Sequence, residues 1–220
     1  MSIISNIVKL KTQLPENVTL VAVSKTKPIA DLVMAYDAGQ HIFGENYVQE
    51  LVEKHAQLPK DIQWHFIGHL QTRKVKHIAP FVDLIHGVDS LKLLNEINNQ
   101  AKNNNRVINC LLQVFIAEEE TKFGLNAIEL ETILKHVSTE NENFKNIQIV
   151  GLMGMASFTE DKNQIEKEFN VLKTLFNKFK IQNSNFKILS MGMSGDYELA
   201  IKCGSNMVRI GSLIFGDRIS

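Results

Sequence analysis

Short apolar runs alternate with helix-like segments along the whole chain. An apolar run bounded by turn residues is typical of a buried strand, and apolar residues at helical spacing are typical of a helix that covers one. The runs predict eight strands, at residues 18–25, 41–46, 62–68, 83–88, 107–116, 147–156, 187–193 and 207–210. Because few polar residues interrupt these runs, we expect parallel strands that are covered by helices.

Helices are predicted between the strands, and one more precedes the first strand. The signals are clearest at 28–38, where Pro28 opens the helix and Gly39 ends it. The other predicted helices cover residues 2–13, 47–58, 72–80, 161–181 and 196–203. One more begins at residue 89 or 90 and runs into the polar stretch 102–105, and another begins after residue 124 and ends at about 137. The polar stretch 138–146 is predicted to be a loop.

Eight strands that alternate with helices in about 200 residues predict a (β/α)8 TIM barrel of the α/β class. We expect one domain over residues 1–220, with the segment 2–13 as an extra N-terminal helix. An open, doubly wound sheet is the alternative, and it is less favoured because eight strand–helix units match barrel closure.

Composition narrows the possible functions. The 220 residues are 44% hydrophobic and 22% charged, with a formal net charge of zero. Without a basic run the sequence does not imply a nucleic-acid partner, and no apolar run approaches the ~18 residues of a membrane span. Cys110 and Cys203 are expected to be buried thiols in a reducing compartment. These features predict a cytoplasmic protein.

Lys25 is the residue with the clearest chemical meaning. It ends the first apolar run and comes just before the helix that Pro28 opens. In a barrel the active site lies at the carboxyl ends of the strands. A half-buried amine there is favoured in its neutral form, which is the form that attacks an aldehyde.

Two later loops resemble a phosphate site. Ser194 and Gly195 end a strand and open a helix, and Gly211 and Ser212 end the eighth strand before a possible short helix at 213–216. Loops after strands seven and eight, together with a short extra helix, form the recurrent phosphate site of these barrels. Each loop taken alone has an ordinary alternative, a serine helix cap beside turn glycines.

Arg209 lies inside an otherwise apolar strand, and a buried arginine needs a partner. In a closed barrel the first and eighth strands are neighbours, so Arg209 should share the barrel mouth with Lys25. The alternative is a structural ion pair with Glu45 or Asp217. A lysine, a phosphate site and a buried arginine in one mouth indicate a phosphorylated aldehyde, and pyridoxal 5′-phosphate (PLP) fits all three.

The same residues carry a family resemblance that runs over nearly the whole chain. The motifs are VAVSKTKP at 21–28, FGENYVQE at 43–50, WHFIGHLQ at 64–71, TKFG at 121–124, GLM at 151–153, SMGMS at 190–194 and MVRIG at 207–211. Together they resemble the pyridoxal phosphate homeostasis proteins, a family similar to the barrel domain of alanine racemase without its second domain.

The resemblance implies a role for each of six residues. Lys25 would carry PLP as a Schiff base, and Arg209 would face the pyridine nitrogen. The phosphate would be held by Ser194, Gly211 and Ser212, and Asn46 would lie beside the cofactor.

Three positions depart from the family pattern. Arg73 stands where asparagine is expected, Gly195 where an acid is usual, and Ser212 where threonine is common. Neither Arg73 nor Gly195 is expected to contact Lys25. The two departures change the expected contacts with partners and the expected geometry of the phosphate site. Lys122 is expected to be a solvated loop lysine.

The expected function is PLP homeostasis: the protein would bind PLP on Lys25 and buffer it or deliver it. The expected partners are apo PLP-dependent enzymes. The protein is expected to be a monomer without turnover of its own. A racemase would need a second base, and Tyr36, Tyr47 and Tyr197 are expected to be core or surface residues instead. Two alternatives stay open, a PLP-dependent amino-acid enzyme that is racemase-like and a cofactor-free Schiff-base aldolase. No metal site is expected, because His65 and His69 straddle a strand end with no further ligand at metal-binding spacing.

Overall fold

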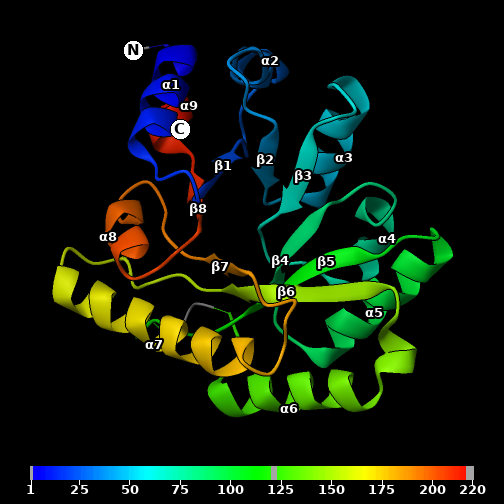
Figure 1. Cartoon of the computed structure of the whole chain (residues 1–220). Coiled ribbons are helices and arrows are strands. Elements are labelled where there is room, and N and C mark those ends of the chain that lie inside the picture. Colours follow the sequence, from blue (N-terminus) through cyan, green and yellow to red (C-terminus); the bar gives the residue numbers. More distant parts are fainter. Residues whose placement is uncertain (1, 120–122, 217–220) are drawn as a thin grey trace.

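Eight parallel strands close into a barrel in the computed structural model, which describes residues 2–119 and 123–216 (Figure 1). The strands are β1 (Thr19–Val23), β2 (Ile42–Glu45), β3 (Gln63–Phe66), β4 (Leu84–Val88), β5 (Ile108–Gln113), β6 (Ile147–Met153), β7 (Ile188–Ser190) and β8 (Met207–Ile210). They pair in chain order, and β1 closes the barrel by pairing with β8. The predicted (β/α)8 barrel is therefore confirmed.

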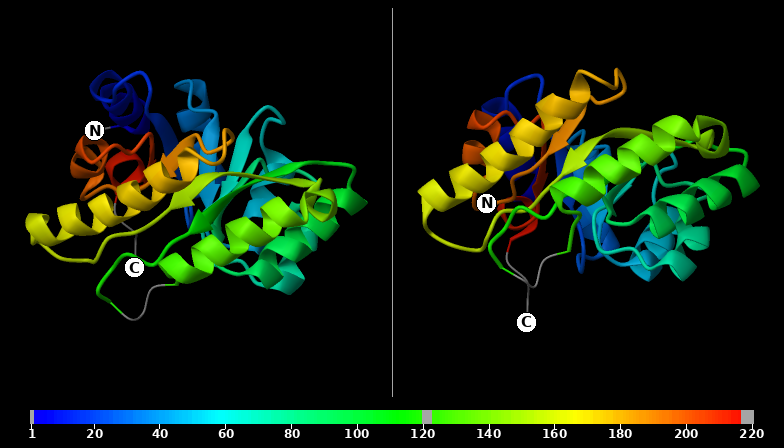
Figure 2. Two further views of the ribbon diagram at one scale, coloured as in Figure 1. Left: turned by 60° about the horizontal axis from the view of Figure 1, so that its bottom comes forward. Right: turned by 90° about the horizontal axis from the view of Figure 1, so that it is seen from below.

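Helices cover the outside of the barrel (Figures 1 and 2). They are α1 (Ile3–Gln13), α2 (Ile29–Asp37), α3 (Val48–Gln57), α4 (Val75–Ile78), α5 (Leu91–Asn103), α6 (Ala127–Thr139), α7 (Lys162–Lys180), α8 (Tyr197–Lys202) and α9 (Ser212–Phe215), with the 3-10 helices η1 (Thr72–Lys74) and η2 (Asn141–Phe144). The predicted extra helix is α1, which the Ser2 hydroxyl caps by accepting from the Ser5 N–H. It lies beside α9, where the Asn6 side chain donates to the Ile214 carbonyl oxygen at 3.0 Å.

Two predicted segments differ from the structure. The helix expected at 72–80 is a 3-10 turn followed by the single turn α4, and Pro80 opposes helical geometry at the residue before it. The stretch 138–146, expected to be a loop, contains η2. Phe144 is buried there, because one apolar side chain in a polar run still gains from packing on the core.

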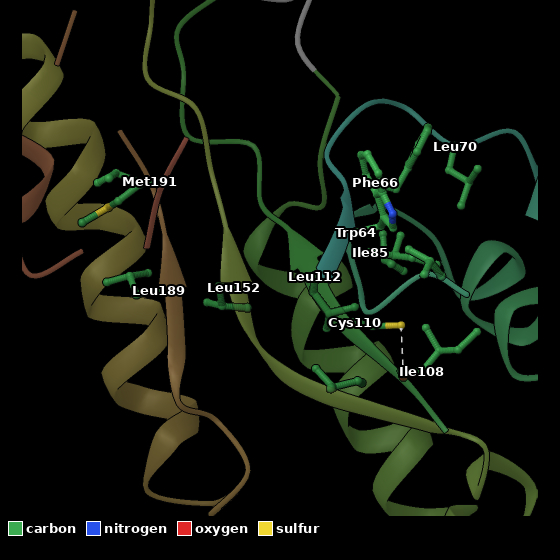
Figure 3. Close-up of a cluster of buried hydrophobic side chains, with 14 of the residues drawn as sticks. Trp64, Phe66, Leu70, Ile85, Ile108, Cys110, Leu112, Leu152, Leu189 and Met191 are labelled. Carbon is green, nitrogen blue, oxygen red and sulfur yellow. Dashed lines mark hydrogen bonds between the residues drawn. The ribbon is translucent and has the colours of Figure 1, made fainter. Parts of the chain in front are cut away.

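Apolar side chains form two layers of core, as the alternation of side chains along a barrel strand requires. A small cluster on the inward-facing positions consists of Val21, Leu84, Leu111, Met153 and Met207. A much larger cluster fills the space between strands and helices. Figure 3 shows part of this outer cluster, including the strand residues Leu112, Leu152 and Leu189.

Both cysteines are buried and free, as the sequence predicts. Burial raises the pKa of the Cys110 thiol, so this thiol is held in its unreactive protonated form. Over residues 2–119 and 123–216, no helix has the length and apolar character needed to cross a membrane.

Candidate functional site

A cavity of about 610 Å³ opens among the loops that follow the carboxyl ends of the strands. It is reached by the segments after β1, β2, β3, β6, β7 and β8, which is where sequence reasoning places the chemistry of a barrel. Its lining includes all six predicted site residues, namely Lys25, Asn46, Ser194, Arg209, Gly211 and Ser212. Residues from the first and the last parts of the sequence therefore line one cavity at the carboxyl end of the barrel.

Lys25 lies two residues beyond the end of β1, not inside the strand as predicted. The backbone turns here, and the Lys27 N–H donates to the Ser24 carbonyl oxygen at 3.0 Å. The turn leaves the Lys25 side chain half-buried on the cavity wall.

The two loops of the predicted phosphate site are joined directly. The Ser194 hydroxyl accepts from the Gly211 N–H at 3.3 Å, so the loop after β7 touches the loop after β8. The predicted short helix after β8 is α9. Gly195 departs from the family pattern without crowding, since a Cβ atom added there would meet nothing within 4 Å. The two loops thus form one continuous wall of the cavity.

Lys27 supports this wall, and sequence reasoning did not single it out. Its ammonium donates to the carbonyl oxygens of Phe215 and Gly216, each at 3.1 Å. A cation at the C-terminal end of a helix satisfies carbonyl groups that have no partner within the helix. The loop that carries Lys25 is thereby tied to α9.

Arg209 is buried on β8, directly opposite Val21 of β1. Its guanidinium donates to the Ser190 hydroxyl at 2.7 Å and to the Gly154 carbonyl oxygen at 3.1 Å. Burial lowers the pKa of Arg209 to about 10, and the side chain remains a cation at neutral pH. The predicted alternative, an ion pair with Glu45, is wrong because Glu45 pairs with a lysine instead, and Asp217 lies outside the described residues.

A chain of buried polar side chains continues from Arg209 across the barrel. Ser190 also lies 3.3 Å from His86 Nδ1, and His86 Nε2 lies 3.1 Å from His65 Nδ1. Burial lowers the pKa of His65 to about 3 and holds the pKa of His86 well below its usual range. Both imidazoles are therefore neutral and serve as hydrogen-bonding groups.

The histidine pair suggested by spacing does not come together. His65 faces His86, whereas His69 lies near Asp89 at 3.2 Å and stacks on the Phe123 ring. Within the part of the chain that the structure describes, no three His, Cys, Asp or Glu side chains are grouped to hold a metal ion.

A second buried network lies behind Lys25, and the sequence patterns missed it. Lys54 of α3 donates to Glu45 at 2.7 Å and to Glu50 at 2.6 Å. Glu45 is fully buried, and its Oε1 also accepts from the Ser24 hydroxyl at 2.6 Å. Burial raises the pKa of Glu45 from 4.5 to about 7, with Lys54 opposing the shift. The Glu50–Lys54 spacing was visible in the sequence, but such a pair is usually on a solvated helix face.

The raised pKa of Glu45 gives a pH prediction. The folded protein keeps the Glu45 proton to a higher pH than the unfolded chain does, so stability falls as pH rises toward the folded pKa. Between about pH 5 and pH 7 this group should remove about 2 kcal/mol from the free energy of unfolding. In Glu45→Gln that loss should be absent. The free energy of unfolding of the variant should therefore rise relative to that of the wild type as the pH increases from about 5 to about 7.

Denaturant titrations at several pH values measure the difference. Glu53→Gln is the matched control, because Glu53 is exposed on α3, the helix that carries Lys54, and should leave the wild-type slope intact. Parallel curves for wild type and Glu45→Gln would contradict the prediction.

Two methionine side chains line part of the cavity, and two others lie in the core. Met155 and Met193 line the cavity, whereas Met153 and Met191 are core residues. Arg73 is exposed and donates to Gln71 at 3.2 Å, away from the cavity. The three tyrosines are absent from the described cavity lining, and Lys122 lies outside the described residues.

Comparison with known proteins agrees with this geometry. Residues 1–219 match the family model "Alanine racemase, N-terminal domain". The chain is 42% identical over 206 residues to the pyridoxal phosphate homeostasis protein of Haemophilus influenzae, covering 91% of this chain and 85% of the relative. It is also 42% identical over 214 residues to the human pyridoxal phosphate homeostasis protein, covering 90% and 76% of the two chains.

Solved structures show the same fold. PipY of Synechococcus elongatus with PLP bound has a TM-score of 0.89 and 34% identity, with 98% of this chain and 100% of PipY covered. An alanine racemase of Clostridium difficile shares the fold at a TM-score of 0.81 and 16% identity, and this chain covers 60% of it. On the strength of the family model and of relatives above 40% identity, the chain belongs to the family of pyridoxal phosphate homeostasis proteins.

Proposed function

We propose that this protein binds pyridoxal 5′-phosphate in the cavity at the barrel mouth and takes part in PLP homeostasis. The observation that carries the proposal is the meeting of Lys25, Arg209 and the joined loops at Ser194 and Gly211 in one cavity of about 610 Å³. Its family and the PLP-bound relative PipY support the same function.

The chemistry of the cavity fits this ligand. When bound, PLP supplies an aldehyde, a phosphate and a pyridine ring. Lys25 offers an amine to the aldehyde as a Schiff base, and the wall of Ser194, Gly211 and Ser212 offers a hydroxyl and backbone groups to the phosphate. Asn46 Oδ1 is buried without a hydrogen-bond partner among the described residues, and a ligand beside it would satisfy this atom.

Arg209 bears on whether the protein turns over a substrate. A cation against the pyridine nitrogen keeps that nitrogen unprotonated, which makes the ring a weak electron sink. The guanidinium is fixed by Ser190 and Gly154, and the pKa of Arg209, about 10, keeps its charge at neutral pH. We therefore infer a carrier that buffers PLP or delivers it to apo-enzymes, acting in the cytoplasm as a monomer with little turnover of its own.

The test is an absorbance spectrum of the purified protein with PLP, before and after borohydride, with mass mapping of the reduced adduct. A band near about 420 nm that borohydride fixes onto Lys25 is expected of a lysine-held PLP. Protein that stays colourless and unmodified with PLP would overturn the proposal. An adduct formed only with a sugar phosphate would favour the Schiff-base aldolase, and turnover of an amino acid would favour the racemase-like enzyme.

A further inference from the structure

The backbone next to Lys25 is strained. Thr26 has a φ of +63°, in the left-handed region that a β-branched residue seldom occupies. Such a conformation is unfavourable in free energy and persists only where the surroundings hold it. The residue that follows the lysine is thus kept in a conformation that it would not adopt on its own.

Side chains of α3 hold the backbone on both sides of Lys25. On one side, the Lys54 ammonium donates to the Ser24 carbonyl oxygen at 2.6 Å. On the other side, the Thr26 N–H donates to Glu50 Oε1 at 2.6 Å. The lysine is therefore flanked by two anchored peptide groups, both fixed from the same helix.

The two anchors are joined to each other, and the one made by Lys54 is buried. Lys54 is 4% exposed and bridges Glu45 and Glu50, while Glu45 is fully buried and also binds the Ser24 hydroxyl. Charge-assisted hydrogen bonds are stronger than neutral ones and more rigid in a dry environment. Each of the two anchors is such a bond, since one has a cationic donor and the other a carboxylate acceptor.

We propose that Glu50 and Lys54 are positioning residues for Lys25, which hold the strained turn after β1 so that its amine is set toward the cavity. This inference rests on the proposed function, in which Lys25 condenses with PLP. The two residues stay outside the cavity, so they act on the lysine through the backbone that carries it. Without the Glu50 anchor the Thr26 turn should relax, which moves the amine away from its reacting position.

Two related ligands separate positioning from general damage to the cavity. PLP has the aldehyde that reacts with Lys25, whereas pyridoxine 5′-phosphate has the same ring and phosphate with an alcohol in its place. The experiment measures the rate of Schiff-base formation with PLP by stopped-flow absorbance, and the affinity for pyridoxine 5′-phosphate by calorimetry. Thermal unfolding of each cofactor-free protein is recorded alongside.

Glu50→Ala is the main variant, because the Glu50 side chain is 21% exposed and Lys54 keeps Glu45 as a partner. We expect Schiff-base formation between about tenfold and a hundredfold slower, as for a misplacement of about 1 Å. Affinity for pyridoxine 5′-phosphate should stay within about twofold of the wild type. Glu50→Gln keeps an oxygen that can accept from the Thr26 N–H, so it should recover most of the rate.

Glu53→Ala is the matched control, since it removes an exposed carboxylate from the same helix and should react as the wild type does. A wild-type rate of Schiff-base formation in Glu50→Ala would overturn the positioning role. So would a fall in the affinity for pyridoxine 5′-phosphate as large as the fall in the rate with PLP. A wild-type protein that binds PLP without an adduct on Lys25 would instead refute the proposed function, so the two failures are distinguishable.

Discussion

Lys25→Ala is expected to abolish the borohydride-fixed PLP adduct while leaving the protein folded. Only an amine forms a Schiff base with the aldehyde, and Lys25 is the lysine that lies just beyond the end of β1 on the cavity wall. Affinity for PLP should fall at least about a hundredfold, or about 3 kcal/mol, since only noncovalent contacts remain. The measurement is mass mapping after borohydride together with a PLP titration.

Two matched variants sharpen this result. Lys25→Arg keeps the positive charge but cannot form the bond, so it should also lack the adduct. Lys27→Ala removes the other lysine of the described cavity lining, with its contacts to α9, and should retain the adduct on Lys25. A Lys25→Ala protein with an unchanged cofactor content would show that another amine holds PLP.

Gly151→Ala is expected to destabilise the barrel by at least about 4 kcal/mol, at the far end of the range for single substitutions. Gly151 lies in β6 with a φ of +155°, and a Cβ atom there would be 1.8 Å from the carbonyl oxygen of Ile188 in β7. The two strands would have to separate, because the clash is with backbone. This contact is a physical reason for the glycine of the GLM motif.

Denaturant unfolding measures the effect. Gly195→Ala is the control, since a Cβ atom there meets nothing within 4 Å, and it should change stability by less than about 0.5 kcal/mol. Equal stabilities for the two variants would mean that β6 and β7 can move apart at little cost.

The local pattern of the sequence was sufficient for the order of elements and for the placement of Lys25 and Arg209 at one cavity. Strand β8 has the predicted bounds, and most other strands are shorter than their apolar runs because those runs continue past the strand ends into the loops. Lys25 and Arg209 were identifiable because a charged residue at the end of an apolar run, or inside one, is unusual. The resemblance of seven motifs then added the cofactor.

What the sequence could not predict were contacts between side chains that are distant along the chain. Lys54 reads as a surface lysine of an amphipathic helix, and only the packing of α3 on the barrel buries it against Glu45. Likewise, the approach of His86 to Ser190 depends on the width of the barrel interior. Neither pairing follows from spacing, since each joins residues from different elements.

The pairing of β1 with β8 has a consequence for how the protein is made. Lys25 follows one of these strands and Arg209 lies on the other, so the cavity cannot form until the segment that contains β8 has left the ribosome. Joining strands so far apart in sequence is slow, and an unfinished barrel leaves strand edges unpaired. A ligand bound between Lys25 and Arg209 would stabilise the closed barrel of the newly synthesised protein, because it binds only that form.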